Sequence, residues 1–272
     1  MENQENRAPE YTMEQGVLRC VVPDLSKYYR EAPARVLALF VAAAAKGCPV
    51  EADTYMAAMD NLDGVRRLPA GIFRSALQNI LLSQRPEAVA PLLNYGVLEP
   101  FGLKGPAPCL HLLNDVPCTM ETRWWSLLHM LGANYAVVCG QLGFSDTFAG
   151  ALSALDSLST LKQLPATVLE LKELLCRLPE VDYPAAARTF ALHDPRWNGQ
   201  AELYDKLYRS GEPYRMRELA ISTGQLAVLG IRDKKAAWVR QRLLEAVIKA
   251  PETNQYPALE MLARTLAQQY KG

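Results

Sequence analysis

Apolar residues recur every three or four positions along most of this chain, the spacing that places them on one face of a helix. One such segment lies between Pro33, which suits the first turn of a helix, and Gly47, which suits its end. Its apolar positions are Val36, Leu37, Phe40, Val41 and Ala44. The spacing therefore predicts a helix that buries one face against the rest of the protein.

The same spacing predicts further helices, and glycine or proline marks most of their ends. In the N-terminal part they cover residues 52–62, 70–82 and 86–94. The helical pattern resumes near Thr119, with breaks near Gly132, Gly143, Pro165, Pro179 and Pro195. The last three predicted helices cover residues 215–228, 233–250 and 256–270.

Three segments depart from this pattern. Residues 1–16 are expected to form a flexible leader, and residues 17–22 a short strand. Residues 99–117 contain four prolines and two glycines, which predicts an irregular connector.

The composition supports an all-α fold, because half of the residues are hydrophobic, Ala and Leu dominate, and β-branched residues are sparse. The 29 basic and 29 acidic residues cancel, so the whole chain is not typical of a nucleic-acid binder. Residues 211–272 nevertheless carry ten Lys and Arg against six Asp and Glu, a surplus of four positive charges. That surplus permits a local phosphate-binding surface.

The six cysteines are dispersed, without a Cys-x-x-Cys pair or a histidine cluster, so neither a metal nor a cofactor is expected. We expect reduced, buried thiols. The polar N-terminus lacks the apolar core of a signal peptide, and no apolar run reaches membrane-spanning length. These features predict a cytoplasmic protein without a membrane segment.

Residues 17–40 resemble the junction between catalytic head and helical neck in bacterial CCA-adding enzymes. These tRNA nucleotidyltransferases belong to a poly(A) polymerase-like family and typically read I-R-C-V-G-D-P-x-x-R-F-x-E-D-A-x-R-x-L-R here. The shared positions are Arg19, Cys20, Val21, Pro23, Glu31, Arg35 and Leu37. Residues 214–230 resemble the family's I-x-D-L-A-I-x-G-x-D-L-x-x-L-G, and residues 242–248 its L-L-E-A-V helix. The resemblance implies an elongated, curved, all-α array with a neck (17–98), a body (99–210) and a tail (211–272).

In that family a Glu-Asp-x-x-Arg element reads the edge of the incoming nucleotide. Here Glu31 and Arg35 match, but the Asp is replaced by Ala32, whose side chain forms no hydrogen bonds. In the helix predicted over 70–82, Arg74 also matches. The resemblance thus implies a degenerate nucleotide-binding set of Glu31, Arg35 and Arg74. The alternative is that Glu31 and Arg35 form an i,i+4 surface ion pair on one helix.

No Gly-Ser or Asp-x-Asp motif of a catalytic head is found, and too few residues precede Val17 to form its sheet. Because nucleotidyl transfer needs carboxylates to place Mg²⁺ on the triphosphate, we expect no catalytic residues and no activity from this chain alone. His129 lies where relatives carry a His-Asp pair, but Met130 follows it, so we interpret it as a structural histidine.

The basic residues of the tail flank an apolar stripe of Ala236, Val239, Leu243 and Val247, a pattern that a solvated amphipathic helix also explains. The resemblance implies RNA contacts instead, since the family's tail binds the tRNA elbow. The candidate RNA-binding residues are Arg232, Lys234, Lys235, Arg240, Arg242 and Lys249.

These observations predict a non-catalytic RNA-binding protein for tRNA or a tRNA-like RNA, recognised through phosphates and duplex shape. One alternative is a helical scaffold that binds a protein, possibly a separate nucleotidyltransferase head supplied in trans. A second alternative is a fragment of a complete tRNA nucleotidyltransferase, against which the altered template argues.

Overall fold

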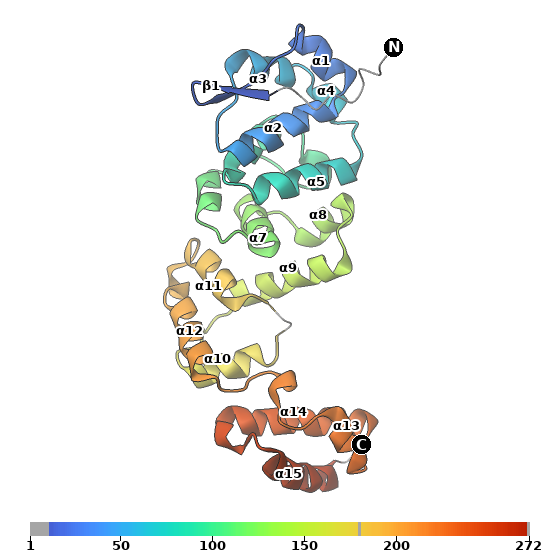
Figure 1. Ribbon diagram of the computed structural model, residues 1–272, viewed down its shortest axis with the longest axis vertical. Coiled ribbons are helices and arrows are strands. Elements are labelled where there is room, and N and C mark those ends of the chain that lie inside the picture. Colours follow the sequence, from blue (N-terminus) through green and yellow to red (C-terminus); the bar gives the residue numbers. More distant parts are fainter. Residues whose placement is uncertain (1–10, 179–180, 271–272) are drawn as a thin grey trace. The chain divides into compact units, whose positions relative to one another are not determined.

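The structure is a computed structural model that describes residues 11–178 and 181–270. The chain forms two compact units, Met1–Ser159 and Thr160–Gly272, which are described separately below. Helices account for 66% of the chain, and the described residues contain one two-stranded sheet (Figure 1). The prediction of a helical fold is therefore confirmed. Nothing in the structure tests the division into neck, body and tail, which stays a prediction.

The first unit begins with a β-hairpin. Strands β1 (Tyr11–Glu14) and β2 (Val17–Cys20) pair antiparallel through a two-residue turn in which Gln15 and Gly16 have positive φ. Leu18 is fully buried, and its N–H donates to the Pro49 carbonyl at 2.8 Å.

The short strand predicted over 17–22 is thus confirmed, but the predicted leader over 1–16 is wrong for residues 11–14. These residues pair with β2, which is itself held by the distant segment 49–51. Residues 1–10 of the predicted leader lie outside the described residues.

Helices make up the rest of the first unit. They are α1 (Leu25–Glu31), α2 (Ala34–Lys46), α3 (Ala52–Met59), α4 (Leu62–Val65), α5 (Ala70–Leu81), α6 (Ala90–Asn94), α7 (Met120–Leu131), α8 (Tyr135–Leu142) and α9 (Asp146–Ser159). Short 3₁₀ turns cover Pro86–Val89 (η2), Glu99–Phe101 (η3) and Leu110–Asn114 (η4). Helices α2 and α5 pack side by side (Figure 1).

The helix predicted over 52–62 is split into α3 and α4. Gly64 lies inside α4, where that helix passes close to Pro33. A Cβ at Gly64 would lie 2.7 Å from the Pro33 Cγ, so only glycine fits there. The predicted helix over 86–94 begins as a 3₁₀ turn before α6, and the segment 99–117 is irregular apart from η3 and η4, as expected.

The second unit contains six α-helices among the residues described. They are α10 (Val168–Leu175), α11 (Tyr183–Ala191), α12 (Gln200–Ser210), α13 (Thr223–Val228), α14 (Asp233–Lys249) and α15 (Tyr256–Gln269). The 3₁₀ turns are η5 (Pro195–Trp197), η6 (Met216–Glu218) and η7 (Pro251–Thr253). The helix predicted over 215–228 is broken because Ser222 and Gln225 form a capping box that starts α13.

A hydrophobic cluster of the second unit forms around α14. One face of this helix buries Val239, Leu243 and Val247 completely, and Leu259 and Ala263 of α15 pack into the same cluster. The apolar stripe predicted for the tail is therefore the buried face of α14, which leaves the opposite face to solvent.

Candidate nucleic-acid interface

Three of the predicted RNA-binding cations share the solvent face of α14. Lys235, Arg242 and Lys249 are spaced seven residues apart, which on an α-helix places each about 20° from the last and about 10.5 Å further along the axis. Arg242 and Lys249 are exposed and Lys235 is half-buried. We call these three residues the basic stripe. Lys235 lies one turn before the buried Val239, at the edge of the buried face, whereas Arg242 and Lys249 lie further toward solvent.

Two further predicted cations lie at the start of the same helix. Arg232 occupies the N-cap position of α14 and Lys234 lies in its first turn, and both are exposed. Exposed cations keep their hydration and are free to exchange it for phosphate oxygens. Four of the six predicted RNA-binding residues are therefore exposed, namely Arg232, Lys234, Arg242 and Lys249, and Lys235 and Arg240 are half-buried.

Within the basic stripe, Arg242 makes contacts with two side chains of its own helix, Glu245 and Trp238. Its Nη1 lies 2.8 Å from Glu245 Oε2 in an exposed ion pair, and its guanidinium lies 5.5 Å from the ring of Trp238. Trp238 in turn packs against Tyr270, with ring centroids 5.6 Å apart. These contacts hold the Arg242 side chain along the helix and partly neutralise it.

Arg240 has a different role from the other five. Its Nη1 donates to Thr223 Oγ1 at 3.0 Å and its Nη2 to the Met216 carbonyl at 2.8 Å, so it ties η6 and α13 to α14. The side chain is half-buried, and its Nε has no partner among the described residues. A change at Arg240 would therefore disturb the fold as well as any RNA contact.

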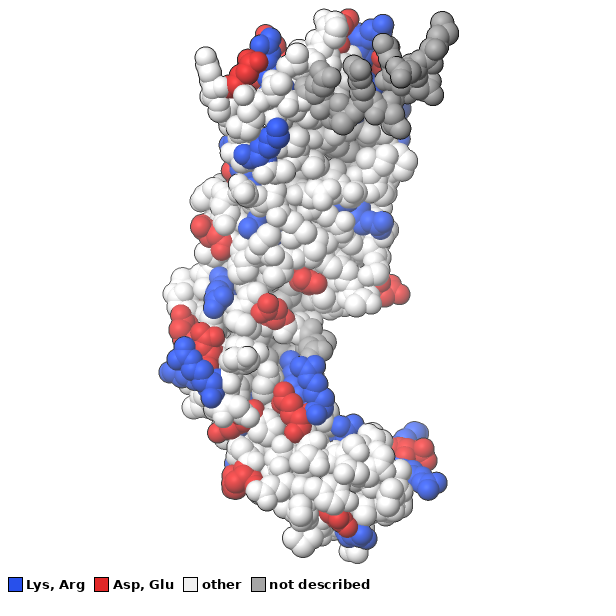
Figure 2. Space-filling view, viewed as in Figure 1, with Lys and Arg blue, Asp and Glu red and all other residues white. Residues whose placement is uncertain are grey.

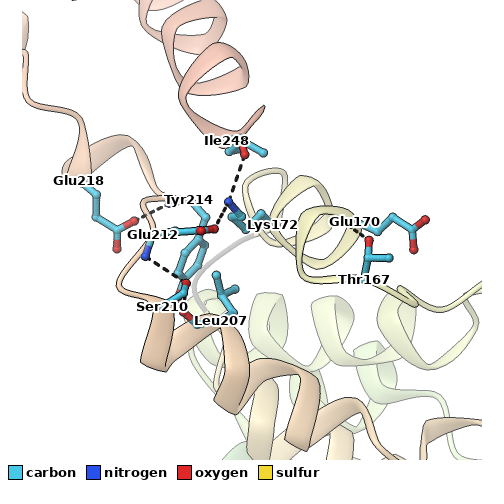
Figure 3. Close-up of polar contacts among 9 residues, drawn as sticks. All are labelled: Thr167, Glu170, Lys172, Leu207, Ser210, Glu212, Tyr214, Glu218 and Ile248. Carbon is cyan, nitrogen blue, oxygen red and sulfur yellow. Dashed lines mark hydrogen bonds and ion pairs between the residues drawn. The ribbon is translucent and has the colours of Figure 1, made fainter. Parts of the chain in front are cut away.

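A buried polar cluster connects the C-terminal end of α14 to the rest of the second unit (Figure 3). Lys172 of α10 is 3% exposed, and its Nζ donates to Glu212 Oε2 at 2.6 Å and to the Ile248 carbonyl at 3.1 Å. Ser210 ends α12 and accepts from the Glu212 N–H at 3.3 Å, which helps to position the carboxylate. We call Lys172, Glu212 and the Ile248 carbonyl the polar lock.

In the segment after Glu212, the linker supplies the donor and the end of α10 supplies the acceptors. Arg215 Nη1 donates to the carbonyls of Leu175 and Leu178 at 2.7 and 2.9 Å. Glu218 accepts from the N–H groups of Tyr214 and Arg215 at 2.8 Å. Arg215 thus holds the linker between α12 and α13 to the C-terminal end of α10 and the residues after it, while the Glu218 hydrogen bonds order the linker itself.

The polar lock was not found from the sequence. Charge patterns along a helix relate residues three or four positions apart. Lys172 lies 40 residues from Glu212 and 76 from Ile248, so no such pattern connects them. The local signal is a lysine within a leucine-rich segment, residues 169–175, which does not identify a partner.

The structure separates Glu31 from Arg35, the core of the predicted nucleotide site. Helix α1 ends at Glu31, and Ala32 and Pro33 form the corner before α2. Glu31 lies 3.9 Å from Lys27, while Arg35 donates to the Tyr28 carbonyl at 2.9 Å and lies 4.1 Å over the Tyr28 ring. The expected i,i+4 pair between Glu31 and Arg35 is therefore wrong, because one helix does not carry both residues.

Arg74 lies on α5 and contacts the end of α8. Its Nη1 donates to the carbonyls of Leu142 and Gly143, and its guanidinium lies 5.9 Å from the Phe144 ring. Arg35 and Arg74 are thus both engaged with neighbouring helices through backbone carbonyls and aromatic rings. A nucleotide-binding role for Glu31, Arg35 and Arg74 stays a prediction.

The described residues contain no group of three or more His, Cys, Asp or Glu side chains close enough to hold a metal ion. All six cysteines are free; three are buried, but Cys118 is exposed, in contrast to the expectation that all are buried. His129 stacks on Trp125 with ring centroids 4.6 Å apart. In the described ranges, no helix has the length and apolar character needed to cross a membrane.

Charges of both signs are interspersed over the face of the molecule drawn in Figure 2, without one large basic field. This agrees with the balance of 29 basic and 29 acidic residues. On this face, any phosphate-binding surface is therefore local.

Comparison with known proteins points to one fold. The chain matches no protein-family model, and no curated protein matches it in sequence. Among solved structures, it is similar to the crystal structure of the Bacillus stearothermophilus CCA-adding enzyme in complex with CTP. The TM-score is 0.61 at 17% identity, over 94% of this chain and 67% of that chain. At this identity the similarity shows the fold alone: the chain has the fold of a CCA-adding enzyme over the matched part.

Proposed function

We propose that this protein is a non-catalytic RNA-binding protein that contacts tRNA or a tRNA-like RNA through the solvent face of α14. The observation that carries the proposal is the basic stripe, three cations in line on one helix, with Arg232 and Lys234 beside its first turn. The similarity to a CCA-adding enzyme supports a tRNA-shaped partner over other polyanions.

The expected recognition is electrostatic. Each lysine or arginine that neutralises a phosphate releases condensed counterions, so the affinity falls as salt rises, in proportion to the number of phosphates neutralised. Cations at regular intervals along a rigid helix can track a phosphate backbone without reading bases. Such a surface binds by the shape and charge of a folded RNA.

The proposal is tested by removing exposed charge from α14. Changing Lys234, Lys235 and Lys249 together to Ala should weaken tRNA binding and make its salt dependence shallower. The slope should fall by roughly one unit for each phosphate that is no longer neutralised. The readout is tRNA affinity by fluorescence anisotropy across a salt series. Arg240 is left intact because its hydrogen bonds support the fold.

A matched control removes three exposed positive charges elsewhere in the same unit, at Lys162, Lys206 and Arg209. This variant should keep the slope and affinity of the wild type. Equal effects of the two triple variants would show that α14 is not the RNA surface. A wild-type protein that fails to bind tRNA even at low salt would favour a helical scaffold that binds a protein, such as a nucleotidyltransferase head.

We further expect that the 272-residue chain does not add CMP or AMP to tRNA. Ala32 cannot hydrogen-bond a base edge, and Arg35 is engaged with Tyr28. Incubation with tRNA, Mg²⁺ and radiolabelled CTP or ATP should leave the RNA unlabelled. Calorimetry should likewise detect no selective binding of either triphosphate, and micromolar binding that disappears on changing Arg35 to Ala would restore a nucleotide site.

A further inference from the structure

One acidic side chain lies among the cations of α14. Glu245 follows Arg242 by three residues, which places it beside Arg242 on the next turn of the helix. Its Oε2 lies 2.8 Å from Arg242 Nη1, and its Oε1 accepts a hydrogen bond from Gln241 Nε2 at 3.4 Å. The basic stripe therefore has a carboxylate held next to its middle cation.

Arg242 differs in this respect from the other surface cations of α14. Lys235 and Lys249, at the two ends of the basic stripe, form no ion pair within the described part of the chain. The same is true there of Arg232 and Lys234 at the start of the helix. The charge of the stripe is thus uncompensated at its two ends, about 21 Å apart along the axis, and compensated in the middle.

The pair between Arg242 and Glu245 is accessible from solvent. The two side chains are 51% and 40% exposed, so water and dissolved anions reach both. The Trp238 ring, 5.5 Å from the guanidinium, helps to keep Arg242 beside Glu245. Exposed ion pairs are weak, so a phosphate that approaches Arg242 can displace the carboxylate, but it must compete with it.

A role in helix stability alone does not depend on where the pair lies. Pairs spaced three or four residues apart stabilise helices at any exposed position. Glu260 and Arg264 form such a pair on α15, 2.8 Å apart and outside the basic stripe. The position of Glu245 among the cations of the stripe, rather than the pair itself, is what indicates a function.

We propose that Glu245 competes with phosphate for Arg242 and so attenuates the binding of RNA to the basic stripe. This proposal rests on the proposed RNA-binding function and describes the regulation of the same surface. With Glu245 ionised, the stripe and its competitor together carry two positive charges in place of three. The stripe then releases fewer counterions than three free cations would, and a polyanion without further contacts binds it weakly.

The test removes the charge of Glu245 and keeps the size of its side chain. Glu245→Gln should raise the affinity for tRNA by about two- to fivefold at low salt, the effect expected when one exposed ion pair no longer competes. The dependence of affinity on salt should become steeper by roughly one unit, because Arg242 is free to neutralise a phosphate. Glu245→Asp keeps the charge and should resemble the wild type. Fluorescence anisotropy across a salt series measures both quantities.

Two control variants separate competition for Arg242 from general effects of charge. Glu260→Gln removes the carboxylate of a comparable exposed pair in the same unit and should leave affinity and salt dependence unchanged. In an Arg242→Ala background, Glu245→Gln should give a smaller gain in affinity, because no guanidinium is released. Thermal unfolding shows that each variant is folded.

The outcomes distinguish the competitor from the RNA surface itself. Wild-type affinity in Glu245→Gln, an equal gain in Glu260→Gln, or the same gain with and without Arg242 would each overturn the competitor alone. A wild-type protein that fails to bind tRNA at low salt would overturn the proposed function, and the competitor with it.

Discussion

Replacing Lys172 by Ala should destabilise the second unit by about 3 kcal/mol. That is near the lower end of the range of ~3–5 kcal/mol for breaking a buried charge pair by removing one partner. The Lys172 side chain is only 3% exposed, so the pair counts as buried. The lower end of the range applies because the Glu212 side chain is 37% exposed and its carboxylate can be hydrated once Lys172 is removed. The Ile248 carbonyl near the end of α14 is also left without its donor.

The reason for so large an effect is the number of segments that share one ammonium group. Lys172 belongs to α10, Glu212 follows α12, and Ile248 lies in the last turn of α14. A lysine at the C-terminal end of another helix also interacts favourably with the partial negative charge of that end. Removing the group leaves a carboxylate and a carbonyl to be hydrated separately.

Native-state hydrogen exchange of amides in α14, combined with urea unfolding, measures this effect within the second unit. Lys172→Met in a Glu212→Gln background is the informative control. It keeps most of the side-chain volume and leaves no unpaired charge, so it should recover much of the stability that Lys172→Ala removes. A destabilisation below about 1 kcal/mol for Lys172→Ala would contradict the role assigned to the polar lock.

The same variant should weaken tRNA binding although Lys172 is buried and touches no RNA. The polar lock holds the last turn of α14, where Lys249 of the basic stripe lies, so its removal should free that end of the helix. We expect the slope of affinity against salt to fall while the Lys172→Met, Glu212→Gln variant retains it. Unchanged binding by Lys172→Ala would show that the stripe does not depend on the lock.

Replacing Leu243 by Ala should destabilise the second unit by about 2–5 kcal/mol, the usual range for deleting a fully buried leucine side chain. Leu243 is 0% exposed and packs in the cluster shared by α14 and α15. The destabilisation combines two costs: the lost transfer free energy of the removed apolar atoms, and the cost of the cavity that remains between the packed helices. Urea unfolding, combined with native-state hydrogen exchange of amides in α14 to assign the change to the second unit, reports it.

Val228→Ala provides the matched control for this prediction. Val228 lies at the end of α13 in the same unit and is 87% exposed, so the change should stay within about 0.5 kcal/mol of the wild type. At moderate denaturant, Leu243→Ala should also stop binding tRNA in parallel with its unfolding. Comparable stability of the two variants would show that α14 is not held by the cluster around Leu243.

The sequence by itself determined most of the helices and the solvent face of α14. Helical spacing depends on neighbours three and four residues away, so α2, α5, α14 and α15 were predicted to within two residues of their ends. The same local reasoning placed Leu243 in the core and Lys235, Arg242 and Lys249 beside the apolar stripe. Amphipathic periodicity contains this information whatever the helix packs against.

Only the tertiary structure decided which charged residues are internal. The corner at Ala32 and Pro33 separates Glu31 from Arg35, and Arg240 turns to the Met216 carbonyl instead of solvent. Lys172 of α10 contacts Glu212 and the Ile248 carbonyl because the fold brings the end of α12 and the end of α14 next to α10. A charged side chain near the core takes whichever donor or acceptor the fold brings within reach, because leaving it unpaired there is costly. That choice depends on contacts between distant segments, which periodicity along the chain does not record.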